Sequence, residues 1–374
     1  MSDMNTLRFE DKQQHTSTPH TDTVGQAIQG ESGQPIAHFH LPGLFEFYDF
    51  YKVFLPIFTE HREYFYEWAD IASIYGAPDC IWGGGRFGEG DAAPKEVAEL
   101  MHRYGISARL TFSNSLLRKE HLSDKKCNNL CEVFENTHCD ENESEDMQRN
   151  VNQSRDKYRN GLRSQDMHKD VGEIANMSHN QAGPANGIIV HSELLLDYLR
   201  KKYPGFYFVS STTKVLTNFD ELRAELERDE FQYVVPDFRL NRRFDKLNTL
   251  PQSVKNKAEF LCNECCDISC TKRRECYENV SRRILGEDCA EHICASPTGN
   301  EGYVFSKAME NPAFISVDDI REIYLPNGFS NFKIEGRGLG SALLLEFILY
   351  YMVPPKLQLK VREAVYLDSE LDLF

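Results

Sequence analysis

Residues 94–112 read Pro-Lys-Glu-Val-Ala-Glu-Leu-Met-His-Arg-Tyr-Gly-Ile-Ser-Ala-Arg-Leu-Thr-Phe. Pro94 suits the first turn of a helix, where its missing N–H costs nothing, and Gly105 suits the residue just past a helix end. The mainly apolar run Ile106–Phe112 that follows has the length of a buried strand. A helix that leads directly into a strand is typical of the crossover that joins two parallel strands.

The same alternation recurs along the chain. Eight apolar runs have the length of strands: Ala37–Leu41, Ile71–Tyr75, Ile106–Phe112, Gly187–His191, Phe206–Ser211, Phe231–Pro236, Ala258–Asn263 and Asn331–Glu335. Thr217–Asp220 and Ser316–Asp319 have the spacing of a capping box at a helix start. Eight strand–helix units predict an α/β fold, a TIM-like (β/α)8 barrel, regular or distorted. An open doubly wound sheet is the alternative, but no glycine-rich nucleotide motif follows the first strand.

Two polar segments interrupt this pattern. Residues 1–35 are rich in Thr, Gln, Gly and Asp and have no periodicity, which predicts a disordered tail. Residues 136–186 contain the acidic stretch Asp-Glu-Asn-Glu-Ser-Glu-Asp and few apolar side chains, which predicts a long disordered insertion. We therefore expect one barrel domain over residues 36–374, interrupted at about 136–186.

The composition and the apolar segments of the chain disfavour some classes of function. The formal net charge is −16 over 374 residues, which disfavours a nucleic-acid surface. The first residues lack the apolar segment of a secretory signal, and the best apolar run, Ser341–Val353, is too short to span a bilayer. We expect a cytoplasmic protein that does not enter a membrane. In a reducing compartment, crowded cysteines bind metal or take part in catalysis more often than they form disulfides.

Seven of the eleven cysteines lie between Cys262 and Cys294, and five of them stand in the stretch Cys262–Cys276. Clustered thiolates are the ligands that a soft metal or an iron–sulfur cluster requires. We predict an iron–sulfur cluster on the loop after the seventh strand. Its candidate ligands are Cys80, Cys262, Cys266, Cys270 and Cys276, with Cys265 as a spare. Zinc and unligated or redox-active thiols are the alternatives. Cys127, Cys131 and Cys139 lie beside the insertion, and we expect solvated or lightly packed thiols there.

Other polar residues follow the predicted strands, where a barrel carries its active site. Gly84, Gly85 and Arg86 are predicted to bind an anionic substrate, although a glycine triplet also suits a tight turn. Arg337 is an anion clamp or the ion-pair partner of Glu335. Asp237 is a general acid or base with Arg239 beside it, or one half of a structural pair. His191 is interpreted as a hydrogen-bonded histidine of the barrel rim. The predicted catalytic set is Asp237, Glu335 and Arg337.

Several of these segments resemble a known family. Phe332–Arg337, Phe-Lys-Ile-Glu-Gly-Arg, resembles the K-I-E-G-R element of the peptidase U32 family. Cys262–Tyr277 is similar to a pattern N-E-x-C-x3-C-x2-R-x2-H-Y in one branch, with Cys276 at the place of the histidine. Tyr75–Cys80 resembles the end of that family's second strand, where a cysteine serves as a cluster ligand. The resemblance extends over about residues 36–345.

The resemblance implies a barrel and, in a divergent iron–sulfur branch, a [4Fe–4S] cluster that supports oxygen-independent hydroxylation of RNA or of the ubiquinone ring. It implies Cys266 and Cys270 as ligands, Cys80 as a further one, and prephenate as oxygen donor in several members. The glycine- and cysteine-containing signature of collagenase-like members is absent, which argues against a peptidase activity. Because the chain is acidic, we predict a small, prephenate-like substrate. A non-catalytic zinc- or cluster-binding interaction module and a U32-type peptidase are the alternatives, and a protein partner stays open.

Overall fold

The computed structural model describes residues 35–83, 92–135, 185–290, 294 and 303–371. The predicted disorder of residues 1–35 and 136–186 lies outside this part of the chain, apart from residues 35, 185 and 186. No helix within the described ranges is long and apolar enough to cross a membrane.

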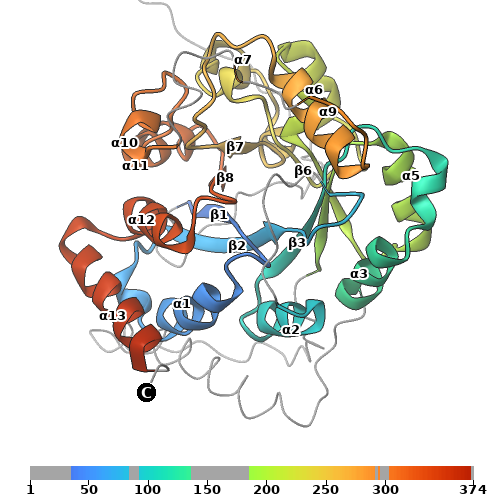
Figure 1. Cartoon of the computed structure of the whole chain (residues 1–374). Helices are drawn as coiled ribbons and strands as arrows, with labels where there is room; N and C mark the ends of the chain where they lie inside the picture. Colours follow the sequence, from blue (N-terminus) through green and yellow to red (C-terminus); the bar gives the residue numbers. More distant parts are fainter. Residues whose placement is uncertain (1–34, 84–91, 136–184, 291–293, 295–302, 372–374) are drawn as a thin grey trace, which may run out of the picture.

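Eight parallel strands form one sheet in the order β6-β5-β4-β3-β2-β1-β8-β7. They are β1 (Ala37–Pro42), β2 (Ala69–Gly76), β3 (Ser107–Phe112), β4 (Gly187–Val190), β5 (Tyr207–Ser210), β6 (Tyr233–Val234), β7 (Glu259–Leu261) and β8 (Asn331–Lys333). A parallel bridge between Val234 and Ala258 joins β6 to the residue before β7 and closes the sheet into a barrel. Figure 1 shows the strands around the centre, with the helices outside them. The predicted (β/α)8 barrel is confirmed, and each of the eight predicted runs overlaps a strand.

Helices follow the strands and cover the outside of the barrel (Figure 1). They are α1 (Tyr48–Glu60), α2 (Pro94–Arg103), α3 (Lys125–Glu135), α5 (Glu193–Lys202), α6 (Phe219–Leu226), α7 (Phe244–Leu247), α8 (Gln252–Lys255), α9 (Arg273–Ile284), α10 (Phe305–Ala308), α11 (Val317–Asp319), α12 (Ser341–Met352) and α13 (Gln358–Leu371). Short turns stand between them: the 3₁₀ turns η1 (Arg62–Tyr64), η2 (Lys119–Ser123), η3 (Thr212–Lys214), η4 (Phe238–Leu240) and η6 (Pro355–Leu357), and the π turn η5 (Ile320–Tyr324).

The helix ends follow the local sequence signals. Pro94 is the first residue of α2, and Gly105 after its end has a φ of 63°, which a residue without a Cβ adopts most easily. The side chain of Ser316 accepts a hydrogen bond from Asp319 N–H, and the Asp319 carboxylate accepts one from Ser316 N–H, so the predicted capping box is confirmed. At α6 the cap is Asn218 rather than Thr217, since Asn218 accepts from Asp220 N–H.

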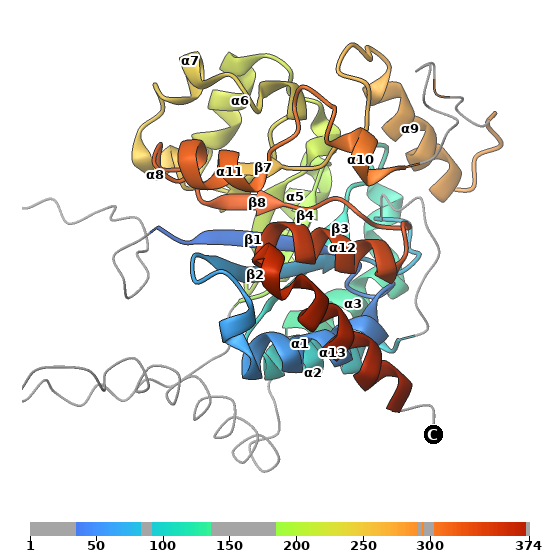
Figure 2. The same ribbon diagram turned by 90° about the vertical axis from the view of Figure 1, so that its left-hand side faces the viewer.

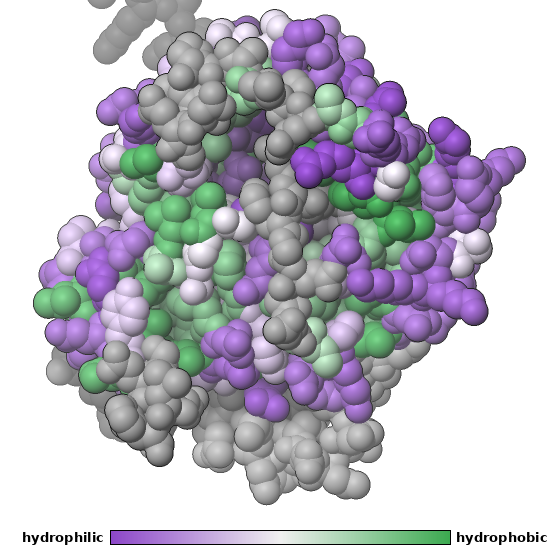
Figure 3. Space-filling model, in the orientation of Figure 1, coloured by the Kyte–Doolittle hydropathy of each residue, from purple (hydrophilic) through white to green (hydrophobic). Residues whose placement is uncertain are grey.

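All strands point the same way, so their carboxyl ends meet at one end of the barrel. In Figure 2 the strands run toward the right, and α9 and α10 lie at that end. Figure 3 shows this carboxyl-terminal face, where hydrophobic side chains gather beside α10 and α12 and beside α9, while hydrophilic ones cover most of the remainder. The loops that follow the strands thus supply the side chains of the barrel mouth.

The interior of the barrel holds a buried charged cluster. The Glu259 carboxylate on β7 accepts hydrogen bonds from Arg109 of β3 at 2.5 Å and from Lys333 of β8 at 3.2 Å. His40 of β1 lies with its Nε2 3.6 Å from the same carboxylate, and its Nδ1 is 2.8 Å from the Ser73 hydroxyl. All of these side chains are buried. Sequence reasoning did not find this cluster.

The cluster has one formal negative charge and two positive ones. These charges, together with burial, shift the pKa values of its side chains. Burial opposes ionisation of Glu259, but Arg109 and Lys333 outweigh it and lower the pKa of that carboxyl. Burial lowers the pKa of Lys333 to about 8, although Glu259 opposes the change. Burial and the Arg109 charge lower the pKa of His40, so this imidazole is neutral near pH 7. Toward the mouth, an apolar layer of Tyr75, Ile189, Val209 and Val235 fills the barrel.

Glu259→Gln should destabilise the protein by about 3–5 kcal/mol, because it leaves Arg109 and Lys333 buried without a counter-charge. The measurement is the free energy of unfolding in urea at pH 7. Asp245→Asn is the control, since Asp245 pairs with Arg243 on the surface, and an exposed pair of this kind contributes about 0–1 kcal/mol. Equal effects of the two substitutions would contradict the central role of Glu259.

Candidate functional site

A group of acidic and basic side chains lies buried at the barrel mouth. Arg273, the first residue of α9, donates a hydrogen bond of 2.5 Å to Glu264, which follows β7. Its Nε is 3.8 Å from the Oδ2 atom of Asp237, which follows β6. Arg239 is 3.3 Å from the other Asp237 oxygen. The predicted Asp237–Arg239 pair therefore exists, and Arg273 joins it. We call Asp237, Glu264 and Arg273 the mouth cluster.

A second pair lies on the neighbouring strand ends. The Nε atom of Arg337, after β8, is 3.7 Å from the Glu46 carboxylate, after β1. Arg337 also donates a long hydrogen bond of 3.5 Å to the carbonyl of Ala77. Burial raises the pKa of Glu46, although Arg337 opposes the change. The sequence left Arg337 as an anion clamp or as the ion-pair partner of Glu335. The carboxylate paired with Arg337 is that of Glu46, whereas Glu335 lies close enough to Glu264 to affect the pKa of that carboxyl.

The electrostatic balance keeps the mouth cluster ionised. Burial opposes ionisation of Glu264, but the charge of Arg273 and the hydrogen bonds from Arg273 and Cys266 N–H lower the pKa of this carboxyl. The pKa of Arg273 rises because Glu264, Tyr277 and Asp237 outweigh its own burial. Arg273 therefore stays positively charged at the mouth at every physiological pH.

Several buried polar atoms of these two groups have no hydrogen-bond partner in the described part of the chain. They are the Oδ2 atom of Asp237, the Nε atoms of Arg273 and Arg337, and both carboxylate oxygens of Glu46. A buried polar atom without a partner costs free energy, so such atoms in a native fold need a reason. Four of these atoms face one another: the Nε atom of Arg273 lies 3.8 Å from Asp237 Oδ2, and that of Arg337 lies 3.7 Å from a Glu46 oxygen, so they form ion pairs just beyond hydrogen-bond distance.

The cysteines in and after β7 differ in how far they are buried. Cys266 and Cys270 are half-buried and close enough to affect each other's charge, and Arg273 donates a hydrogen bond to the Cys266 sulfur. Burial nevertheless raises the pKa of Cys266 to about 12. Cys276 is half-buried on α9, and Cys265 is exposed. Cys262 lies in the hydrophobic core, on the same side of β7 as Phe260 and opposite to the interior-facing Glu259.

Cys80 belongs to a different group of thiols. It is buried after β2, and its sulfur shares a hydrogen bond with that of Cys127 on α3. Cys131, one turn further along α3, is close enough for the Cys80 charge to raise its pKa. The Gly83 N–H group donates to the carbonyl oxygen of Cys80 at 2.9 Å. The prediction that Cys127 and Cys131 are solvated or lightly packed is wrong, because both are fully buried.

In the described arrangement, these positions limit the ability of the thiols to bind a metal ion together. Among the described residues, no group of three or more His, Cys, Asp or Glu side chains is arranged so that it could hold a metal ion. Cys139, Gly84, Gly85 and Arg86 lie outside the described residues.

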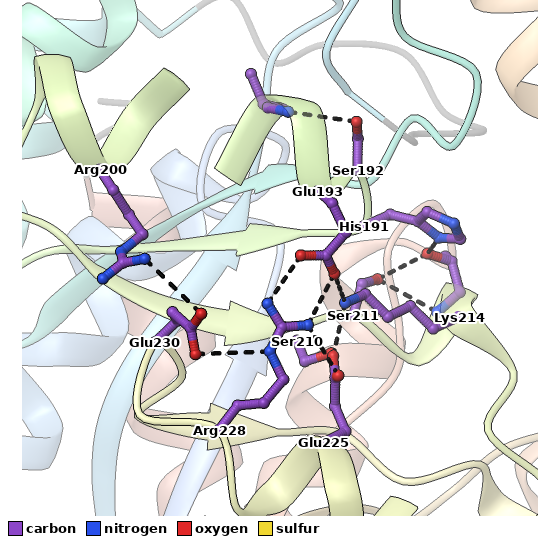
Figure 4. A network of polar contacts seen from close by, with 12 residues as sticks. His191, Ser192, Glu193, Arg200, Ser210, Ser211, Lys214, Glu225, Arg228 and Glu230 are labelled. Carbon is purple, nitrogen blue, oxygen red and sulfur yellow. Dashed lines mark hydrogen bonds and ion pairs between the residues drawn. The ribbon is translucent and has the colours of Figure 1, made fainter. Parts of the chain in front are cut away.

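A pocket of about 370 Å³ opens between the ends of β4 and β5 and helix α9. Its lining residues are Ser115, Leu116, His191, Glu193, Thr213, Lys214, Glu225, Arg274, Tyr277 and Glu278. Figure 4 shows the network behind it, in which Lys214 and Arg228 both bind Glu193 and Glu225. Sequence reasoning missed this pocket, apart from His191, because its charges come from helices and turns rather than from one motif.

The chain was compared with protein families, curated proteins and solved structures. No protein-family model matches the chain, and no curated protein matches it significantly. A solved structure described as the U32 peptidase Mk0906 is similar over 83% of this chain and 96% of its own, with 11% sequence identity and a TM-score of 0.41. These matches do not assign the chain to a family. Mk0906 carries the family name that the sequence motifs resemble, but at this TM-score the likeness supports no argument about activity.

The pKa of His191 predicts an acid sensitivity. Burial, Lys214 and Arg274 lower this pKa to about 4, so the unfolded chain binds the proton more tightly than the folded one. Stability from this group is therefore present above about pH 6.5 and is lost as the pH falls toward 4. His191→Gln should reduce the loss of unfolding free energy between pH 7 and pH 5 by about 1–2 kcal/mol. Urea unfolding at the two pH values measures it. His61→Gln, at an exposed histidine, is the control, and an unchanged pH dependence in His191→Gln would refute the assignment.

Proposed function

We propose that this chain is an iron–sulfur enzyme related to the U32 type, which acts on a small anionic organic substrate at the mouth of its barrel. The observation that carries the proposal is the pair of buried arginines at the mouth, Arg273 and Arg337, whose Nε–H groups face carboxylates at ion-pair distance but without a hydrogen bond. Guanidinium groups are suited to binding carboxylates. Oxygen-independent hydroxylation is the reaction class that the sequence resemblance suggests.

The side chains at the mouth have complementary roles in this proposal. Arg273 and Arg337 orient carboxylate groups of the substrate, and the acidic partners Asp237 and Glu46 keep the two arginines in place. Asp237 has one buried oxygen without a hydrogen-bond donor, so it is suited to accept a proton from a substrate hydroxyl. Glu335 lies beside Glu264 at the same mouth and is the second carboxylate available for proton transfer.

The proposed [4Fe–4S] cluster fits the thiols only in part. Cys266 and Cys270 lie in one half-buried loop, and the positive charge of Arg273 partly opposes the burial that raises the pKa of Cys266. A cluster of this kind takes up to four thiolates, and the described arrangement brings no third one to them. Cys276 on α9 and Cys80 remain the further candidates, and Cys80 would first have to leave Cys127. When bound, the cluster would supply one-electron chemistry beside the substrate.

The thiol proposal is tested by purifying the full chain without oxygen and measuring iron, acid-labile sulfide, zinc and visible absorbance. We expect iron and sulfide in equal amounts and a broad absorbance near 400 nm, a wavelength of the order typical of thiolate-ligated clusters. Cys266→Ala and Cys270→Ala should each lose most of the iron and of the absorbance, because each removes a proposed ligand.

Cys289→Ala is the matched control, since Cys289 is also half-buried but interacts with Asn279 beyond the proposed ligand set. It should keep the iron content of the unmodified chain. A colourless preparation with stoichiometric zinc would reject the enzyme in favour of a zinc-binding module. Retention of the chromophore in both Cys266→Ala and Cys270→Ala would reject the ligand assignment.

A further inference from the structure

We propose that the pocket between β4, β5 and α9 binds a free amino acid as a zwitterion, with its carboxylate on Arg274 and its ammonium group on Glu278 and His191. None of these residues belongs to the mouth cluster or to the proposed cluster ligands. The inference therefore stands or falls independently of the iron–sulfur proposal.

The first step is the protonation state of His191. Its Nδ1 atom lies 2.8 Å from the Thr213 hydroxyl, and that hydroxyl donates its own proton to the Ser211 hydroxyl at 2.9 Å. Thr213 therefore accepts from His191, which requires the proton to be on Nδ1. Because burial, Lys214 and Arg274 keep the imidazole neutral, its Nε2 atom carries a lone pair and accepts hydrogen bonds.

The tautomer is supported beyond this one contact. Ser211 accepts from both the N–H and the hydroxyl of Thr213, so its own proton is free for the Ser113 hydroxyl at 3.1 Å. The hydroxyls of Thr213, Ser211 and Ser113 thus form a chain that runs in one direction from the imidazole. The Nε2 atom makes no hydrogen bond to any described residue, and the ring lines the pocket. A ligand at this position must offer a hydrogen-bond donor.

The second step is the balance of charge around the pocket. Lys214 is 2.8 Å from Glu193 and 2.6 Å from Glu225, and Arg228 binds the same two carboxylates at 2.8 Å and 3.1 Å. These four charges neutralise each other, as the contacts in Figure 4 show. Glu193, Lys214 and Glu225 line the pocket and Arg228 lies behind them, so this part of the wall has no net charge to offer a ligand.

Arg274 and Glu278 are the charges that remain. Arg274 donates one hydrogen bond of 3.3 Å to the Lys214 carbonyl, and within the described chain neither side chain forms an ion pair. They stand four residues apart on α9, so their Cβ atoms are about 5–6 Å apart on one face of the helix. Both line the pocket. The open face of the pocket therefore carries one positive and one negative group beside a neutral acceptor.

These groups match the polar end of an amino acid. Arg274 offers paired N–H donors to a carboxylate. Glu278 and the Nε2 atom of His191 are acceptors, and an ammonium group has three N–H donors. A simple anion would meet the charge of Glu278, and a simple cation would meet Arg274, so each fits less well than a zwitterion. The volume of about 370 Å³ leaves room for a side chain against Leu116 and Tyr277.

The binding experiment uses the purified full chain and each standard amino acid in turn at millimolar concentration, with saturation-transfer NMR as the readout and calorimetry for the best ligand. The analogue of that ligand without its amino group and the analogue without its carboxylate should each bind at least about tenfold more weakly, because each loses a charge-assisted hydrogen bond. If no amino acid binds, or if the best ligand tolerates the loss of either group, the proposal is rejected.

Substitutions then locate the site. Arg274→Gln and Glu278→Gln should each weaken binding at least about tenfold. Arg282→Gln on the same helix, at an arginine 3.5 Å from Glu287, should leave binding unchanged. Nitrogen-15 NMR of the histidines should show His191 with the proton on Nδ1 at pH 7. A proton on Nε2, or equal effects of Arg274→Gln and Arg282→Gln, would overturn the assignment.

Discussion

The Glu259 carboxylate is the interaction on which the rest of the barrel depends. It stands on β7, at the closure of the sheet, and receives Arg109 from β3 and Lys333 from β8. β3 and β7 lie far apart in the strand order, so the Arg109–Glu259 bond crosses the barrel rather than following its wall. A buried ion pair contributes little net stability, but loss of one partner is costly. The contacts therefore restrict which strand positions can face one another inside the barrel.

This restriction reaches the mouth along the same strands. Lys333 lies over the ring of Tyr75, whose hydroxyl donates to the carbonyl of Ile334, next to Lys333. Glu335 N–H in turn donates to Asn263, which follows β7. Each of these contacts lies one or two residues nearer the carboxyl end of its strand than the contact before it. The position of Glu259 in its strand thereby sets the height at which Glu264, Glu335 and Arg337 enter the mouth.

The fold could be predicted from the sequence because its signals are local. Apolar runs, Pro94, Gly105 and the Ser316 capping box each act within a few residues. The interior charges could not be predicted, since Arg109 and Glu259 are 150 residues apart and each looks like an interruption of an apolar run. Glu335 was one candidate partner for Arg337 because alternate strand residues share a face. β8 ends at Lys333, so that period does not extend to Arg337. The grouping of Cys80 with Cys127 depends on packing between β2 and α3, which spacing along the chain does not encode.

Helix α9 connects the two regions of the mouth. Successive residues of a helix point about 100° apart, so Arg273 and Arg274 face different surroundings: Arg273 is buried beside Asp237 and Glu264, and Arg274 lines the pocket. The loop with Cys266 and Cys270 leads directly into this helix. The described arrangement does not bring a third thiolate to those two, so Cys276 could join them only after a shift of this loop or of α9. Such a shift would move Arg273 within the mouth and Arg274 within the pocket at the same time. The first turn of α9 is thus the element through which the thiols and the pocket would affect each other.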